Sequence, residues 1–407
     1  MVAGDARALM VPASLLRDAG ILATDDVICT VDQGELRLRA DRLRRVYVEA
    51  TTRCNLECTT CIRHSWDESL TDMPMARYEQ LLEGLPASEP KAPTSLAFAG
   101  FGEPLAHPGF LGMVRLAAGR GHRVEVISNG TLLDAAAARE LVSSGAAQVT
   151  VSIDGGDDAS HRGIRGGEIN RPVAALHALL AARLRRRAHL AVGLAAVATA
   201  GNVGSLPELL RLASDLRLDF VSISNVVPHT AELAGSTLWD RAAWASVFRA
   251  GAWRPRLHVA RLDLDERTRP LADAITAVGL TFPSPSLDGH AWRNHCRFVH
   301  EGMLAVAADG RVAPCLSLLH THTEHINSQA RVVHALVVGH IDETPLAEIW
   351  QVPAYREFRR RLRAFDFPPC FHCGGCPSTE DNLEDCYRNP FPVCGECLWA
   401  QGLVLCP

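Results

Sequence analysis

Between residues 45 and 230 the chain alternates strand-like and helix-like segments, and this alternation limits the possible fold more than any other feature. The apolar, strand-like runs lie at 45–51, 95–100, 123–128, 148–154, 190–197 and 220–227. Helical patterns such as LDAAAARELVSSG and SLPELLRLASDLR separate them. Strands and helices that alternate at this spacing build a parallel sheet covered by helices. We therefore expect an α/β fold, an open or partial barrel, over residues 44–240, with working residues at the carboxyl ends of the strands.

The sequence changes character on both sides of this region. Residues 1–43 combine short β-type runs with a small helix, which predicts a small β-rich module. This module is either a sheet extension or a swapped hairpin that resembles half of some transcription regulators, and Cys29 is expected in its core. Residues 241–290 are interpreted as connecting helices and loops. Residues 291–407 hold nine cysteines among turns and short hairpins, and are expected to form a separate domain.

Composition excludes several kinds of function. The chain has 41 Lys and Arg against 46 Asp and Glu, which argues against a nucleic-acid partner. The arginine-rich runs at 183–187 and 356–363 are expected to be solvated helix faces. Lysine occurs once, as Lys91 in a proline-flanked stretch, so a lysine Schiff base is not expected. No apolar run is long enough to span a membrane, and the first residues do not resemble a signal peptide, so we expect a cytoplasmic protein.

Three cysteines are crowded into the segment EATTRCNLECTTCIRHSW, directly after the first strand-like run. Cys54, Cys58 and Cys61 have the spacing C-x3-C-x2-C. In the cytoplasm, metal binding is a better interpretation of such spacing than disulfides. Three thiolates on a 4Fe–4S cluster leave one iron open to a small chelating molecule. The alternative is a zinc site that His64 completes.

At this point the sequence resembles the radical S-adenosylmethionine (SAM) superfamily, which carries C-x3-C-x2-C after the first strand of a partial (β/α)6, TIM-like barrel. The resemblance implies that Cys54, Cys58 and Cys61 hold the catalytic cluster. It also implies that SAM binds the open iron, and that one electron cleaves it to methionine and a 5′-deoxyadenosyl radical. Thr60 departs from the family, which usually has an aromatic or large apolar residue there that packs against adenine.

Further motifs at successive strand ends resemble elements of the same family. AGFGEPLAHP is similar to the Gly-Gly-Glu-Pro element, with Phe101 in place of the first glycine. ISNGTLL is similar to Thr-Asn-Gly, with serine for threonine, and VSIDGGDD to the Ser-x-Asp ribose element. Arg165, in the segment HRGIRGG, is expected to form a charge-assisted hydrogen bond with the methionyl carboxylate. The SAM contacts that the resemblance implies are Gly102, Glu103, Pro104, Ser128, Asn129, Ser152, Asp154, Arg165 and Asn225.

The carboxyl-terminal cysteines resemble a SPASM domain, which holds auxiliary 4Fe–4S clusters in radical SAM maturases. The resemblance begins with Cys296-x13-Gly310-x4-Cys315, in which Gly310 occupies a hairpin turn. The later spacing departs from the family, and the candidate ligands are Cys296, Cys315, Cys370, Cys373, Cys376, Cys386, Cys394, Cys397 and Cys406. Two clusters use eight of these cysteines, and the spacing does not show which one is spare. One cluster with a zinc knuckle at Cys394-x2-Cys397, or zinc alone, are the alternatives.

A histidine-rich piece, HTHTEHINSQARVVH at 320–334, interrupts this domain. Four histidines so close together are able to bind metal, but we interpret the piece as a solvated loop insertion.

The chain as a whole, and above all its ending NPFPVCGECLWAQGLVLCP, looks like the radical SAM and SPASM proteins that modify the cofactor of tungsten-containing aldehyde ferredoxin oxidoreductases. The resemblance implies a maturase, with the tungstopterin cofactor or the oxidoreductase as its substrate. It also implies a ferredoxin or flavodoxin as electron donor. The first alternative is a maturase of a ribosomally synthesised peptide. The second is an iron–sulfur scaffold or electron carrier without catalytic activity.

Overall fold

The computed structural model describes residues 11–21, 26–32, 35–86, 93–239, 256–277, 294–326, 329–368, 370 and 376–405. The chain separates into two compact units, Met1–Leu43 and Arg44–Pro407. In the first unit, helix α1 (Ala13–Asp18) precedes an antiparallel hairpin of β1 (Val27–Asp32) and β2 (Glu35–Ala40). Successive residues of a strand point to opposite faces, so Ile28 is buried while Cys29 is exposed. The expectation of a core position for Cys29 is therefore wrong.

The second unit is built on one large sheet, which has ten strands among the described residues. Its parallel strands follow the order β10 (Met303–Val306), β3 (Arg45–Val48), β4 (Ser95–Phe98), β5 (Arg123–Ser128), β6 (Ala146–Ser152), β7 (Ala191–Ala198), β8 (Phe220–Asn225) and β9 (Arg256–Val259). Two antiparallel strands, β11 (Arg311–Ala313) and β14 (Gly339–His340), extend the sheet beyond β10. The expected α/β, barrel-like fold is confirmed, and the six predicted runs correspond to β3–β8.

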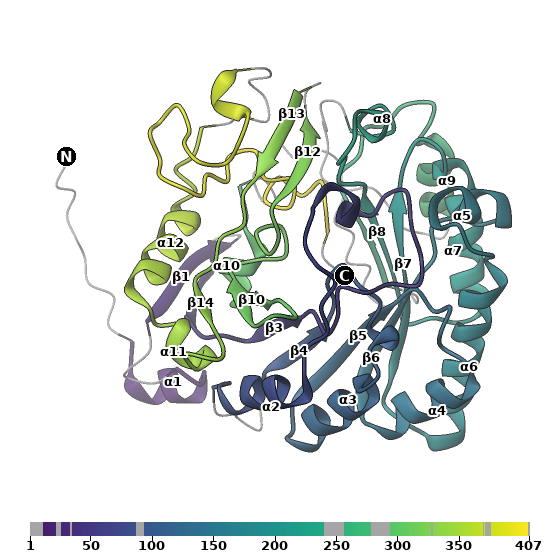
Figure 1. Ribbon diagram of the computed structural model, residues 1–407, viewed down its shortest axis with the longest axis horizontal. Helices are drawn as coiled ribbons and strands as arrows, with labels where there is room; N and C mark the ends of the chain where they lie inside the picture. Colours follow the sequence, from purple (N-terminus) through teal and green to yellow (C-terminus); the bar gives the residue numbers. More distant parts are fainter. Residues whose placement is uncertain are drawn as a thin grey trace. The chain divides into compact units, whose positions relative to one another are not determined.

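Helices cover the outer face of this curved sheet (Figure 1). They are α2 (Met75–Glu83), α3 (Phe110–Gly119), α4 (Ala135–Ser143), α5 (Asp158–Arg165), α6 (Asn170–Arg186) and α7 (Leu206–Asp215). Polar side chains cap the first turns of two of these helices. Asp134 accepts hydrogen bonds from backbone amides at the start of α4, and Asp157 does so at the start of α5. Apolar strand residues such as Val46, Phe98 and Val149 are fully buried beneath the helices. Short loops therefore place the motifs directly at the carboxyl edge of the sheet.

Two interpretations of the region after residue 240 need correction. Residues 256–259 were expected in a connecting segment, but they form β9, which pairs in parallel with β8. The histidine-rich piece contains a hairpin of β12 (His322–Ile326) and β13 (Gln329–Val333); His322 in this hairpin is only 3% exposed, and His320, which precedes β12, is only 2% exposed. Alternating residues of β12 face the protein interior, and His320 contacts Glu49 and Glu68, so the solvated-loop interpretation is wrong for these two side chains.

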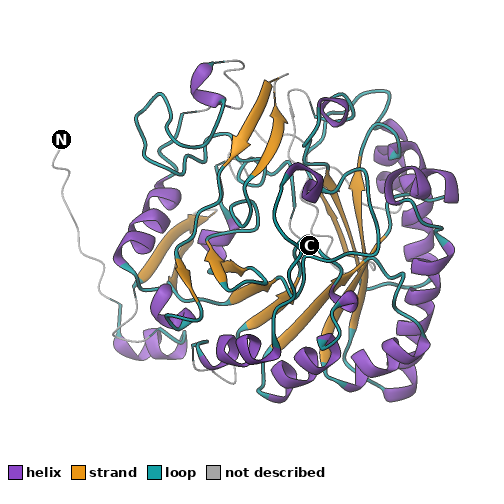
Figure 2. Ribbon diagram, viewed as in Figure 1, coloured by secondary structure: helices purple, strands orange, loops and turns teal. Residues whose placement is uncertain are grey.

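The remaining helices are short, with the exceptions of α9 and α12. They are η1 (Ile62–Ser65), η2 (Pro104–Ala106), η3 (Val203–Ser205), α8 (Ala231–Ala234), α9 (Arg269–Ala277), α10 (Arg297–Glu301), α11 (Leu346–Ile349), α12 (Pro353–Ala364) and η4 (Pro377–Thr379). The longer helix α12 carries the run 356–363, but Arg359 is buried, 3.9 Å above the ring of Trp350. A cation–π contact stabilises it there, so the run is not wholly a solvated face. After α12 the described chain is mostly loop (Figure 2).

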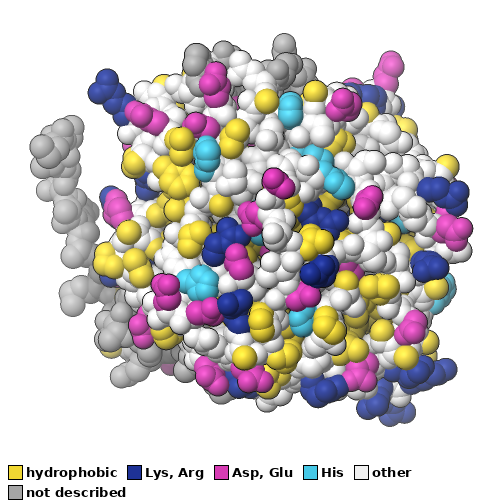
Figure 3. Space-filling view, viewed as in Figure 1, with side chains coloured by type: hydrophobic (Ala, Val, Ile, Leu, Met, Phe, Trp, Pro, Cys, Tyr) yellow, Lys and Arg dark blue, Asp and Glu magenta, His cyan; other side chains and the backbone are white. Residues whose placement is uncertain are grey.

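Basic and acidic side chains are interspersed over the face of the molecule in Figure 3, apart from a basic group at its lower right. This mixture agrees with the near balance of charges in the sequence. In the described part of the chain, no helix combines the length and the apolar character needed to cross a membrane.

Candidate functional site

A cavity of about 310 Å³ opens at the carboxyl edge of the parallel strands. Most of the residues expected to contact the catalytic cluster or SAM line it, namely Cys54, Cys58, Cys61, Gly102, Glu103, Ser128, Asn129, Ser152, Arg165 and Asn225. Two others, Pro104 and Asp154, are buried but are not part of the cavity wall. The strand ends thus bring residues that are up to 171 positions apart (54 to 225) into one cavity.

The loop that carries the three cysteines is held from both sides. The Arg63 guanidinium donates to the carbonyls of Thr52 (2.9 Å) and Leu56 (3.3 Å), across the base of the loop. The Thr59 amide donates to the Ile164 carbonyl of α5 (2.8 Å). Burial raises the pKa of the Cys58 thiol to about 11, so this thiol keeps its proton near neutral pH unless a metal displaces it.

The donor set fits a cluster better than a single metal ion. Within the described residues, no three His, Cys, Asp or Glu side chains converge closely enough to hold one ion. The imidazole of His64, the fourth ligand of the zinc alternative, instead contacts the Cys58 carbonyl through Nε2 (3.2 Å). In a 4Fe–4S cluster each thiolate binds a different iron, so the thiols surround a volume and do not meet at a point. The three thiols of this cavity wall suit that arrangement.

Glu103 ties the ends of β4 and β5 together. Its carboxylate accepts from the Ser128 hydroxyl (2.8 Å), the Asn129 amide (2.7 Å) and the Leu105 amide (3.1 Å). The side chain is 2% exposed, and burial raises the pKa of this carboxyl although the hydrogen bonds oppose the rise. Gly102 allows the close approach of the cysteine loop, because a Cβ there would lie 2.0 Å from the Thr51 carbonyl oxygen. A larger residue at position 102 would therefore displace the cysteine loop, and loss of the Glu103 carboxylate would remove the hydrogen bonds that join the ends of β4 and β5.

Asn129 connects the end of β5 to the cysteine loop. Its Nδ2 donates to Asn55 Oδ1 (2.9 Å) and lies 3.9 Å from the Cys54 sulfur. Its Oδ1 accepts from the amide and the hydroxyl of Thr131. Most of the hydrogen-bonding groups of the Asn129 side chain therefore have partners. These partners hold its Nδ2 group beside the Cys54 sulfur.

Asp154 and Arg165 form a buried ion pair beside the cavity. Asp154 has no exposed surface, and its Oδ2 lies 2.7 Å from Arg165 Nε while its Oδ1 accepts from the Val197 amide (2.7 Å). Asp154 thus orients Arg165, which reaches the cavity, and does not itself line it. The expected contact of Asp154 with a ribose is a role that Ser152, on the wall, is better placed to fill.

The carboxyl-terminal segment closes one side of the cavity. Asn225 Nδ2 donates to the carbonyls of Arg261 (2.6 Å) and Leu403 (2.9 Å), and the Leu405 amide donates to Ser224 Oγ (2.9 Å). Asn225 Oδ1 is buried and has no hydrogen-bond partner among the described residues. Trp399 and Leu405 also line the cavity. The sequence around these two residues contains no motif from which this could have been predicted.

Four cysteines of the carboxyl-terminal region form a second group. Cys296, Cys394 and Cys397 each raise the pKa of the Cys315 thiol, after burial as the main cause. A second cavity of about 270 Å³ is lined by Cys296, Cys315 and Cys397, and it shares Ser222 and Trp399 with the first cavity. Val404 and Leu405 also line both cavities, so this cysteine group lies close to the first cavity.

A third group is described only in part. Cys386 contributes to the raised pKa of Cys370, so these two thiols are neighbours, and η4 begins directly after Cys376. Cys373 and Cys406 lie outside the described residues.

Comparisons with known proteins agree with this geometry. Residues 48–197 match the radical SAM superfamily, and residues 296–377 match SPASM, an iron–sulfur cluster-binding domain. The chain is 30% identical to a tungsten-containing aldehyde ferredoxin oxidoreductase cofactor-modifying protein of Pyrococcus furiosus, over 90% of this chain and 97% of that protein. It is 27% identical to a PqqA peptide cyclase of Gluconobacter oxydans, over 85% of this chain and 88% of the relative.

Solved structures resemble the chain in fold. The crystal structure of Streptococcus suis SuiB bound to precursor peptide SuiA superposes with a TM-score of 0.56 at 14% identity, over 85% of this chain and 69% of SuiB. SuiB bound to S-adenosylmethionine gives a TM-score of 0.53 at 13% identity, over 79% of this chain and 68% of SuiB. The chain therefore belongs to the radical SAM superfamily of enzymes and carries a SPASM iron–sulfur domain in its carboxyl-terminal region.

Proposed function

We propose that Cys54, Cys58 and Cys61 hold the 4Fe–4S cluster at which this enzyme cleaves SAM. The observation that carries this proposal is the cavity wall, where among the described residues no further cysteine and no histidine accompanies these three thiols. With Cys54, Cys58 and Cys61 as its ligands, such a cluster would leave one iron for SAM and would supply the electron that cleaves SAM to methionine and a hydrogen-abstracting 5′-deoxyadenosyl radical. The chain's own residues have to hold the cluster, orient SAM and exclude water.

The roles of the SAM-side residues follow from their partners. Arg165 is engaged by Asp154 through Nε, which leaves its terminal nitrogens for the methionyl carboxylate. Among the described residues, Asn225 Oδ1 is a buried acceptor without a partner, suited to a donor group of SAM. Glu103 fixes the loop that faces the methionyl amine, and Ser152 offers a hydroxyl to ribose. Thr60 and Ile62 lie on the wall, so the apolar contact to adenine falls to Ile62.

We further propose two auxiliary 4Fe–4S clusters. Cys296, Cys315, Cys394 and Cys397, whose thiols influence one another, make up one ligand set. Cys370, Cys373, Cys376 and Cys386 make up the other, which leaves Cys406 as the spare cysteine. The first set adjoins Trp399 of the catalytic cavity, so it is placed to exchange electrons with a substrate radical there.

The substrate we propose is the tungstopterin cofactor of an aldehyde ferredoxin oxidoreductase, or that oxidoreductase itself. The relative from Pyrococcus furiosus, which is named as a modifier of this cofactor, supports the proposal because the two chains match over almost their full lengths. The second candidate is a ribosomally made peptide, which the resemblance to the PqqA peptide cyclase and to peptide-bound SuiB favours. A ferredoxin or flavodoxin is the proposed electron donor in both cases.

Co-expression separates the two substrates. The enzyme is produced with a tungsten-containing aldehyde ferredoxin oxidoreductase in one culture and with a candidate precursor peptide in another. We expect the oxidoreductase or its extracted pterin to change mass only when the active enzyme is present, and the peptide to keep its mass. A peptide that loses hydrogen mass, beside an unchanged pterin, would establish the second candidate instead. The enzyme with Cys58→Ala is the control in both cultures.

A further inference from the structure

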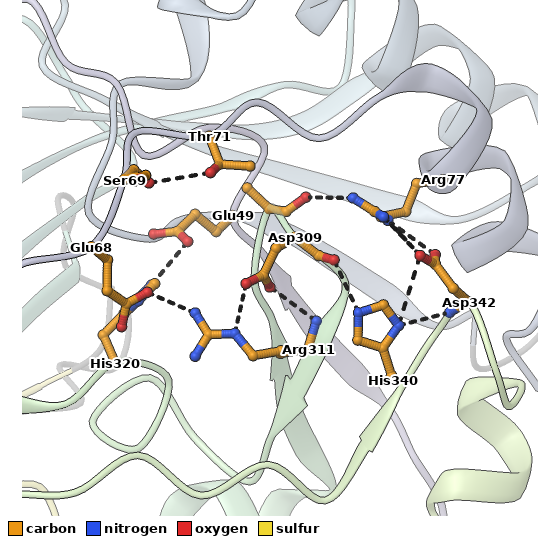
Figure 4. Close-up of polar contacts among 11 residues, drawn as sticks. Glu49, Glu68, Ser69, Thr71, Arg77, Asp309, Arg311, His320, His340 and Asp342 are labelled. Carbon is orange, nitrogen blue, oxygen red and sulfur yellow. Dashed lines mark hydrogen bonds and ion pairs between the residues drawn. The ribbon is translucent and has the colours of Figure 1, made fainter.

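His320 lies between two glutamates, Glu49 and Glu68 (Figure 4). Its Nε2 lies 3.0 Å from Glu49 Oε2, and its Nδ1 lies 2.9 Å from Glu68 Oε2. Glu49 directly follows β3, Glu68 follows η1, and His320 precedes β12. His320 and Glu49 are only 2% and 1% exposed, so this contact is shielded from water. It joins the carboxyl-terminal region to the first strand of the barrel.

The contacts specify the charge of the imidazole. A neutral histidine has one N–H, whereas both ring nitrogens here face a carboxylate oxygen, and only the imidazolium can donate to both. Burial by itself lowers the pKa of His320, but the hydrogen bonds and charges of Glu49 and Glu68 outweigh it, and the pKa is raised. Arg311 forms ion pairs with Glu68 (2.7 Å) and Asp309 (2.6 Å), so positively and negatively charged side chains alternate along this network.

Glu49 connects His320 to the backbone segment on the side of the cavity where we propose that SAM binds. Its Oε1 accepts from the Phe101 amide (3.1 Å), at the start of the Phe101–Pro104 segment. Gly100 lets the segment lie against Glu49, because a Cβ there would be 2.8 Å from Glu49 Cγ. The Trp66 ring packs edge-on against both His320 (3.8 Å) and Phe101 (5.1 Å). The backbone before Glu103 is thus fixed by a carboxylate that His320 holds in place.

We propose that His320 is a positioning residue for SAM binding, because it holds Glu49 against the Phe101 amide and so fixes the segment that carries Gly102 and Glu103. The inference rests on the proposed SAM site. It gives the carboxyl-terminal region a direct part in forming the catalytic cavity. It also explains the phenylalanine at position 101, whose ring takes part in the packing around His320 (5.7 Å).

The first test replaces His320 by glutamine, which can donate to one carboxylate but carries no charge. We expect SAM to bind about tenfold more weakly to the reconstituted enzyme, the cost of about one hydrogen bond to a charged group. Equilibrium dialysis with labelled SAM measures the affinity. Hydrogen exchange measured by mass spectrometry is expected to be faster in the peptide that contains Phe101. Unchanged affinity and unchanged exchange would overturn the inference.

The matched control is Arg77→Gln. Arg77 and Asp342 form another ion pair between α2 and the carboxyl-terminal region (2.7 Å), drawn in the same view, but neither residue contacts Glu49. This variant is expected to bind SAM like the wild type and to exchange the Phe101 amide at the wild-type rate. Equal losses in both variants would mean that His320 acts only through general stability.

A pH series supplies a readout that does not depend on removing His320. Because the pKa of His320 is raised in the folded protein, its charged form holds Glu49 at low pH, and the contribution is lost as pH rises through that pKa. Glu68→Gln, at a partly exposed site, removes one of the two charges, so wild-type affinity should persist to higher pH than that of this variant. Identical pH profiles of the two proteins would contradict the inference. Failure of the wild type to bind SAM would contradict the proposed function instead, and amide exchange would still test His320.

Discussion

Replacing Cys58 by alanine is expected to abolish the formation of 5′-deoxyadenosine. Residues that merely orient a metal ligand are worth about 10–100-fold in affinity or activity, so the loss of a ligand itself should exceed about 100-fold. If two auxiliary clusters are present, about one-third of the iron should be lost with it. The measurement is chromatography of 5′-deoxyadenosine after anaerobic reconstitution, together with iron analysis.

Cys29→Ala is the matched control for this variant. Cys29 is an exposed cysteine of the separate unit Met1–Leu43, and it should be replaceable without effect on iron content or turnover. A Cys58→Ala protein that keeps its full iron content and at least half of the wild-type turnover would show that the catalytic cluster lies elsewhere.

The second large effect is expected from Arg165→Met. Asp154 has no exposed surface, and Arg165 is its charged partner at 2.7 Å, so the variant leaves a buried carboxylate without a counter-charge. Removal of one member of a buried pair costs about 3–5 kcal/mol of stability. We expect the urea midpoint of unfolding to fall, and SAM binding to be lost because Arg165 is the cation that we propose for the methionyl carboxylate. Tryptophan fluorescence and equilibrium dialysis check the two results.

Arg162→Met separates this effect from the loss of any arginine on α5. Arg162 lies on the same helix, but its partners Asp158 and Glu168 are exposed, and surface pairs contribute about 0–1 kcal/mol. A midpoint near that of the wild type and normal SAM binding are expected. If Arg165→Met behaved like Arg162→Met, the buried pair would have no part in SAM binding.

The sequence predicted those parts of the fold that depend on local pattern. Apolar runs of strand length, separated by amphipathic helices, correctly indicated β3–β8 and the parallel sheet. The motifs follow these strands directly, so their meeting at one edge follows from parallel topology. The strand β9 was missed because Arg256–Val259 is short and alternates with polar residues. No local pattern indicates that β10 pairs with β3, across more than 250 residues (45 to 303).

The candidate site was predictable in its residues but not in all of their roles. A Ser-x-Asp motif does not reveal that Asp154 is turned toward Arg165 and the Val197 amide, because this depends on how α5 and β7 pack. The spacing of the carboxyl-terminal cysteines does not show which of them belong to the same ligand set, because this depends on tertiary contacts. His320 was interpreted as part of a solvated insertion, and only the positions of Glu49 and Glu68 show it as a buried link.

The most direct measurement of the central claim uses the wild-type protein. After anaerobic reconstitution with iron and sulfide, it is given SAM and dithionite, and 5′-deoxyadenosine and methionine are quantified. Cleavage at the cluster of Cys54, Cys58 and Cys61 predicts equal amounts of the two products, and a reduced-cluster electron paramagnetic resonance signal that changes when SAM is added. An iron-loaded wild-type protein that forms neither product, with a signal indifferent to SAM, would contradict the claim.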